Sequence, residues 1–196
     1  MKKDQGKNTL LTSILMSAPG PLILGIGLLS SHALTQLADF IRRFLELLAI
    51  IMAYIIYQIT QKSNTNKDQL ERLSHLFTGW MMMIGGVIMI FLAFFDSNQN
   101  KGNVLSGLII ALLGVIANFI FWRRYTKLSK QQNNSILAIQ AVLYRAKTIV
   151  DCTVTLTLSI VQFLPTFQYT IYIDKIGSII VAIYLIWSGY QTIKKR

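Results

Sequence analysis

Asp39-Phe40-Ile41-Arg42-Arg43-Phe44-Leu45-Glu46 lies inside a stretch that is otherwise apolar from about residue 33 to residue 57, and this stretch decides the fold. On a helix its four ionisable residues fall at i, i+3, i+4 and i+7, so they share one face. If the stretch crosses a membrane, that face cannot meet lipid, because charged side chains are costly there. We therefore predict a helical bundle with this face turned inward.

The composition agrees with a membrane protein. The chain has 196 residues, of which 53% are hydrophobic and 14% charged, whereas about a quarter of residues are charged in soluble domains. Several apolar runs approach the roughly 20 residues that a helix needs to cross a bilayer. The predicted fold is all-α: one polytopic membrane domain over residues 1–196, with six transmembrane helices and no C-terminal cytoplasmic domain. The approximate spans are 9–30, 34–59, 76–95, 104–122, 136–164 and 173–190.

The net charge of +11 is distributed unevenly between the two sides of these spans. The opposite loops contain only Lys101 and Lys175, and four cations lie inside spans. Thirteen cations flank the spans on one side: Lys2, Lys3, Lys7, Lys62, Lys67, Arg72, Arg123, Arg124, Lys127, Lys130, Lys194, Lys195 and Arg196. Loops rich in Lys and Arg stay in the cytoplasm. The asymmetry predicts cytoplasmic N and C termini in a plasma membrane of the bacterial type, and it makes a nucleic-acid partner unnecessary.

Three local patterns refine the helices. Pro19-Gly20-Pro21 should kink or break the first span, because proline removes backbone donors. The polar segments Gln61–Gln69 and Thr126–Ser135 are predicted to be cytoplasmic linkers. The alternating Thr and Ser residues at 153–159 could indicate a strand, but in a span their hydroxyls can bond to carbonyls of the preceding turn, so we expect a helix.

The fifth span carries a second group of charges. Lys147 and Asp151 are spaced i, i+4 and can pair, as Arg42 and Glu46 can in the second span. Such neutralisation is expected in a low-dielectric interior. If the two spans face each other, these four residues could form one network.

Two interpretations of the charges remain open. In the first, they form a mid-membrane transport site, where Glu46, Asp151, Asp39 or Lys147 cycles a proton or an acid binds a cation; arginine cannot lose its proton. Arg43 and Asn118, a polar residue in the fourth span, would support such a site. In the second, the pairs lock helix register in a non-transporting protein that acts through a partner membrane protein.

The order of these motifs resembles one known family. Ala38-Asp39-x-x-Arg42-x-x-x-Glu46 resembles the motif Ala-Asp-x-x-His-x-x-x-Asp in the second helix of cation diffusion facilitators. Lys147-x-x-x-Asp151 resembles its partner in the fifth helix, and the segment from Asp174 to Gly189 is similar to the sixth helix. Glu71 and Asn118 also occupy positions where family members often carry them.

The resemblance implies a transporter that exports a divalent metal against protons, usually as a homodimer. Glu46 and Asp151 match two carboxylate positions of the family's metal site. Arg42 and Lys147 match the other two ligand positions, where they would bring positive charge; a guanidinium offers no lone pair. The resemblance thus predicts a cation antiporter whose central site is altered. Any metal would be its substrate and not a cofactor.

The remaining patterns predict no enzyme and no cofactor. No nucleotide-binding loop, zinc-protease motif or nucleophile arrangement is present in the sequence. We expect Met81-Met82-Met83 and the single cysteine, Cys152, to serve packing, and His32 and His75 to lie at the membrane interface. The expected partners are the lipid bilayer and either a second copy of the chain or another membrane protein.

Overall fold

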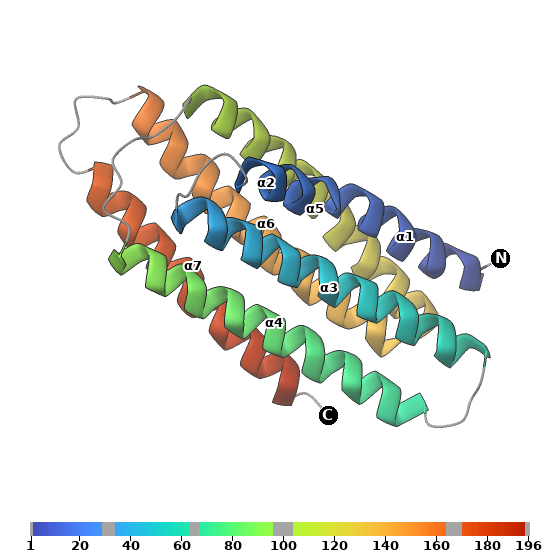
Figure 1. The fold of residues 1–196 in the computed structure, drawn as a ribbon. Coiled ribbons are helices and arrows are strands. Elements are labelled where there is room, and N and C mark those ends of the chain that lie inside the picture. Colours follow the sequence, from blue (N-terminus) through green and yellow to red (C-terminus); the bar gives the residue numbers. More distant parts are fainter. Residues whose placement is uncertain (1, 29–33, 63–66, 96–103, 164–169, 195–196) are drawn as a thin grey trace.

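Long helices pack side by side in a single elongated bundle (Figure 1). The computed structural model describes residues 2–28, 34–62, 67–95, 104–163 and 170–194, and these segments contain helices and no strand. The helices are α1 (Lys2–Ser17), α2 (Pro19–Leu28), α3 (Leu34–Lys62), α4 (Lys67–Phe95), α5 (Val104–Gln132), α6 (Ser135–Phe163) and α7 (Thr170–Lys194). The all-α prediction is therefore confirmed for the described residues.

The first predicted span is interrupted where the two prolines occur. Helix α1 ends at Ser17, and α2 begins at Pro19. The amide of Ala18 still donates to the Ile14 carbonyl at 2.9 Å. Pro19 and Pro21 have no N–H group with which to continue this pattern. The predicted break is confirmed.

The predicted linkers are shorter than expected. Helix α4 already begins at Lys67, and α5 continues to Gln132, so most of the polar segment Thr126–Ser135 is helical. That prediction was wrong because Lys and Gln are good helix formers, and because Leu128 is buried against the bundle. Polarity alone did not end the helix.

Two asparagines make the turn between α5 and α6. Asn133 adopts a left-handed conformation with φ of 45°, and the Asn134 amide donates to the Ser129 carbonyl at 3.2 Å. This is the hydrogen bond that commonly closes a helix before such a residue. The Asn134 side chain then accepts a bond from the Leu137 amide at 3.1 Å, which caps the start of α6.

The polar positions of α6 follow the predicted pattern. Thr153 donates to the Ile149 carbonyl at 3.0 Å, Thr155 to the Asp151 carbonyl at 2.7 Å, and Ser159 to the Thr155 carbonyl at 2.7 Å. Each hydroxyl is thus satisfied within its own helix. The prediction of a helix over this segment is confirmed.

The core lies where α1, α3, α5 and α6 meet. Three tyrosines, Tyr57, Tyr125 and Tyr144, are among its largest fully buried side chains. Smaller apolar residues surround them, including Leu10, Ala49, Ile50, Ala53, Leu137 and Leu143. Helices α4 and α7 form a second close pair beside this group (Figure 1).

Glycines bring α4 and α7 into backbone contact. A Cβ atom placed on Gly189 would lie 2.6 Å from the Gly79 carbonyl oxygen, and one placed on Gly86 would lie 2.8 Å from the Ala182 carbonyl oxygen. Small residues at a helix interface permit such close approach in membrane proteins. Gly86 and Gly189 thus allow the backbones of α4 and α7 to approach closely.

Adjacent glycines offer a test of this contact. We expect Gly86→Ala to destabilise the protein by about 1–3 kcal/mol, since the added methyl group meets backbone that cannot move aside. Gly85→Ala is the matched control, because its Cβ atom would meet only the Arg42 Cγ atom at 3.7 Å. Thermal unfolding of the detergent-purified variants measures the difference. Equal melting temperatures for the two variants would contradict the close packing.

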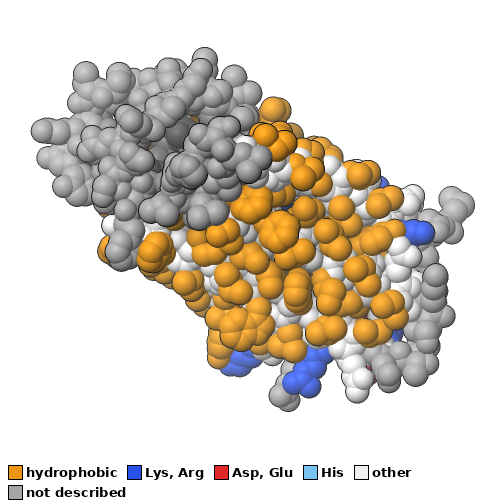
Figure 2. Space-filling model, in the orientation of Figure 1, with side chains coloured by type: hydrophobic (Ala, Val, Ile, Leu, Met, Phe, Trp, Pro, Cys, Tyr) orange, Lys and Arg blue, Asp and Glu red, His pale blue; other side chains and the backbone are white. Residues whose placement is uncertain are grey.

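The outer surface is largely apolar. On the face shown in Figure 2, hydrophobic side chains cover the middle of the bundle, and Lys and Arg lie toward the end where α1 begins and α7 ends. We call this the basic end. By length and composition, two helical stretches within the described residues could cross a membrane, Lys67–Phe94 and Ile176–Lys194.

Candidate functional site

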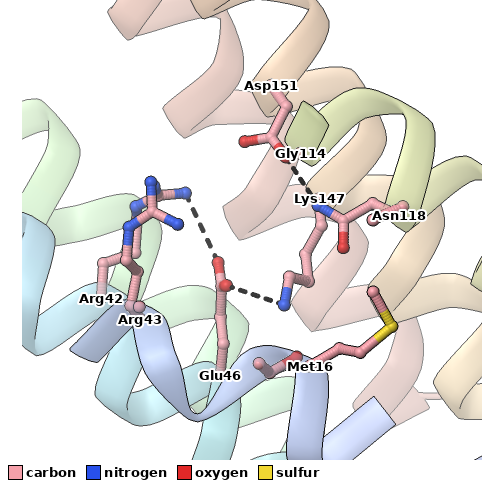
Figure 3. Close-up of a pocket in the computed structure, with 11 residues that line it drawn as sticks. Met16, Arg42, Arg43, Glu46, Gly114, Asn118, Lys147 and Asp151 are labelled. Atoms are coloured by element: carbon pink, nitrogen blue, oxygen red, sulfur yellow. Dashed lines mark hydrogen bonds and ion pairs between the residues drawn. The ribbon is translucent and has the colours of Figure 1, made fainter. Parts of the chain in front are cut away.

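The charged face of α3 borders a cavity of about 120 Å³ near the junction of α1 and α2 (Figure 3). One water molecule occupies about 30 Å³ in the liquid, so the cavity can hold a small hydrated group. Helices α1, α2, α3, α5 and α6 all contribute to its wall. The lining residues are Met16, Ser17, Gly20, Arg42, Arg43, Glu46, Gly114, Ala117, Asn118, Lys147 and Asp151.

Glu46 lies between two cations from two helices (Figure 3). Its Oε1 atom is 3.5 Å from Arg42 Nη1, and its Oε2 atom is 3.3 Å from Lys147 Nζ. The solvent-exposed fraction of the side chain is 14% for Glu46, 11% for Arg42 and 12% for Lys147. The predicted pairing of Arg42 with Glu46 is confirmed. The contact of Lys147 with Glu46 also confirms that the second and fifth predicted spans face each other.

The predicted pair of Lys147 with Asp151 does not form, so the prediction of a four-residue network was wrong. Lys147 extends across the bundle to α3, where its ammonium group meets Glu46 and lies 5.0 Å from the centre of the Tyr144 ring. Asp151 instead accepts a hydrogen bond from Asn118 Nδ2 at 2.6 Å. Among the described residues, Asp151 has no ion-pair partner within 4 Å.

A glycine that the sequence reasoning missed makes room for this arrangement. A Cβ atom placed on Gly114 of α5 would lie 2.7 Å from Asp151 Oδ2. The absence of a side chain there lets the Asp151 carboxylate approach α5 and reach Asn118. Proximity of a glycine and an acid from different helices cannot be read from spacing along one helix.

Of the other predicted site residues and histidines, one lines the cavity, one lies on a distant pair of helices, and two have side chains outside the described part. Arg43 lines the cavity, and its Cδ atom is 3.5 Å from the position that a Cβ atom on Gly20 would take. Asp39 belongs to α3, but its side chain lies outside the described part. His32 also lies outside it. His75 contacts the Thr192 carbonyl at 3.3 Å, on the far pair of helices.

Among the described residues, Glu46 and Asp151 are those that bring carboxylates to the cavity wall. Within the described ranges no three His, Cys, Asp or Glu side chains come together as a metal site. The arrangement can therefore accept a proton or offer carboxylate oxygens to a cation, with Arg42 and Lys147 as counter-charges.

The sequence matches the cation efflux transmembrane domain family over residues 10–196. The chain belongs to this family. The resemblance to cation diffusion facilitators is thereby confirmed, and this cation efflux domain is an integral membrane protein of a transporter family. No curated protein sequence matches it.

Proposed function

We propose that this cation efflux domain exchanges a cation for protons across the membrane, through the cavity between α3 and α6. The observation that carries the proposal is the environment of Asp151. Its carboxylate lines the cavity, its side-chain partner is the neutral amide of Asn118, and the described residues give it no ion pair. An acid held in this way within a membrane domain can take either a proton or a cation.

The surrounding charges would set the conditions for binding. Arg42 and Lys147 both lie against Glu46. A divalent metal ion would need oxygen ligands from Glu46 and Asp151, so Lys147 would have to move away from Glu46. Because both Glu46 contacts are longer than 3.2 Å, we propose that Lys147 is the counter-charge that changes partner between inward-open and outward-open states. Asp39 of α3 is the proposed second acid.

We also propose a topology for the domain. Counting α1 and α2 as one interrupted span gives six transmembrane helices over residues 1–196, with both termini in the cytoplasm of a bacterial-type plasma membrane. Two observations support this: α1 begins and α7 ends at the same end of the bundle (Figure 1), and Lys and Arg gather there. Cytoplasmic ends of membrane proteins are rich in these residues. A homodimer, or a complex with another membrane protein, is the proposed assembly.

A second candidate function is a structural lock without transport. The observation that favours it is the pairing of Glu46 with cations from both α3 and α6. Such a pair can fix helix register. In that case, the domain would act through a partner membrane protein.

Flux into proteoliposomes tests the transport proposal. The purified protein is reconstituted with an internal metal-sensitive dye and a pH dye, and zinc, manganese, iron(II) and cobalt are added in turn. We expect movement of at least one metal with protons moving in the opposite direction. If the protein is correctly folded and none of the four metals moves, metal export is overturned and the structural lock is favoured.

A further inference from the structure

Hydroxyl groups run from the cavity toward the basic end of the bundle. Thr9, Ser13 and Ser17 are spaced i, i+4 and i+8 on α1, so they share one face of it. Tyr125 of α5 and Tyr144 of α6 face them. Four of these five side chains are fully buried, and Ser17, which lines the cavity, is partly buried. We call these five residues the hydroxyl line.

Contacts join the hydroxyl line across three helices. Ser17 Oγ is 3.3 Å from the Tyr144 hydroxyl. The Tyr144 ring stacks on the Tyr125 ring, with 5.3 Å between centroids and 27° between planes. The Tyr125 hydroxyl is in turn 2.6 Å from Ser13 Oγ. Two hydrogen-bonded pairs, Ser17 with Tyr144 and Tyr125 with Ser13, thus follow one another from the cavity along α1. The ring stack between them carries no proton, so a water molecule is needed to join the Tyr144 and Tyr125 hydroxyls.

The hydrogens of this line have alternative acceptors. The Tyr125 hydroxyl can donate to Ser13 or to the Thr9 carbonyl, which is 3.3 Å away. Ser13 can donate to Tyr125 or to the Leu10 carbonyl at 2.8 Å. A hydroxyl with two acceptors can reverse the direction of its hydrogen bond without moving its oxygen. Passage of successive protons requires this reversal.

A buried amide lies beside the line. Gln140 is fully buried, and neither its side-chain oxygen nor its nitrogen has a hydrogen-bond partner among the described residues. It is spaced i, i+4 and i+7 with Tyr144 and Lys147, so it shares their face of α6. A buried amide left without partners costs about 1–3 kcal/mol, and internal water commonly satisfies such groups. Water bound at Gln140 would add further links beside Tyr144.

We propose that the hydroxyl line carries protons between the cavity and the basic end. This rests on the proposed function and adds a route to its site. A proton from water at the basic end binds one hydroxyl oxygen of the Tyr125–Ser13 pair, and that pair passes a hydrogen on to a water molecule. The water then gives a proton to the Tyr144–Ser17 pair in the same way, so every side chain ends neutral. Cavity water delivers the final proton to the Asp151 carboxylate, and release reverses the sequence. Charged groups beside the line include Lys147, whose ammonium lies over the Tyr144 ring, and Arg124, which precedes Tyr125 in α5. Arg145 follows Tyr144 in α6, and Arg43 and Glu46 line the cavity with Ser17.

Two assays on reconstituted full-length protein separate this role from a structural one. The first measures net zinc movement driven by a pH gradient, which needs protons to travel. The second measures exchange of radioactive zinc for unlabelled zinc at equal pH, which needs none. We expect Tyr144→Phe and Tyr125→Phe to slow the first by about 10-fold or more, in line with the loss of a positioned proton-transfer group, and to leave the second unchanged.

Tyr184→Phe is the matched control, because its hydroxyl is also buried but lies on α7 and has no partner among the described residues. It should leave both rates unchanged. Millimolar formate on the basic side should partly restore the net rate of Tyr144→Phe by supplying protons through a small acid. If Tyr144→Phe keeps the wild-type net rate, or if both of its rates fall together, the hydroxyl line is not a proton route. Both assays use the metal that moves in the proteoliposome test, with zinc tried first. If none of zinc, manganese, iron(II) and cobalt moves through the wild type in either assay, the transport proposal and this inference are overturned together.

Discussion

Glu46→Gln is expected to destabilise the folded domain by about 3–5 kcal/mol, the range typical of removing one partner from a buried ion pair. Glu46 is the only described acid within 4 Å of Lys147, and it also contacts Arg42. Its loss leaves the Lys147 ammonium buried without an opposite charge. Lys147→Met should cost less, because Glu46 then keeps its contact with Arg42 and the methionine fills similar space.

The double variant Glu46→Gln/Lys147→Met separates the ion pair from the individual side chains. We expect it to recover most of the stability lost by Glu46→Gln, since the uncompensated charge is removed. Unfolding of the purified variants in detergent, monitored by helical circular dichroism, gives the three values needed for a double-mutant cycle. Independent, additive effects of the two substitutions would contradict the contact between α3 and α6.

The helices could be predicted because their causes are local. Each cause affects only residues close to it in the sequence. These causes are the apolar runs of sufficient length, the prolines at positions 19 and 21, and the hydroxyls of α6 that bond to carbonyls of the preceding turn. The predictions failed where packing extended a helix beyond its apolar part. Helix α5 continues through Lys127 and Lys130 because it still buries Tyr125 and Leu128.

The cavity could be predicted only in part. Spacing placed Arg42 and Glu46 on one helical face, and the structure confirms their contact. Spacing within α6 also suggested a pair of Lys147 with Asp151, but a lysine side chain is long enough to reach a neighbouring helix. Which acid it meets depends on how close the helices are. Gly114 decides that distance for Asp151, and its role becomes visible only when α5 and α6 are packed together.

The two acids of the cavity therefore differ in what they should control. Glu46 contacts two cations on two helices, so its charge contributes to the fold. Asp151 contacts a neutral amide, so its charge is not needed to balance a cation within 4 Å among the described residues. Removing the Asp151 charge should therefore abolish cation movement and leave the stability of the folded domain nearly unchanged.

Asp151→Asn is expected to reduce proton-coupled cation movement to the background of empty vesicles. An amide neither binds a proton at physiological pH nor offers a charged oxygen to a cation. Stability should change by no more than about 1.5 kcal/mol, since the carbonyl oxygen of the new side chain can still accept the bond from Asn118. The measurement pairs flux in proteoliposomes with thermal unfolding of the same preparation.

Asp68→Asn provides the matched control, because it removes the same charge from an exposed position in the first turn of α4. It should transport like the wild type. If Asp151→Asn also transports like the wild type, Asp151 is not the coupling acid, and Glu46 becomes the remaining described carboxylate of the cavity. If Asp151→Asn unfolds as readily as Glu46→Gln, the Asp151 carboxylate belongs to the structural charges, and the lock is favoured over transport. Loss of flux in a stable Asp151→Asn protein is the result that only the transport proposal predicts.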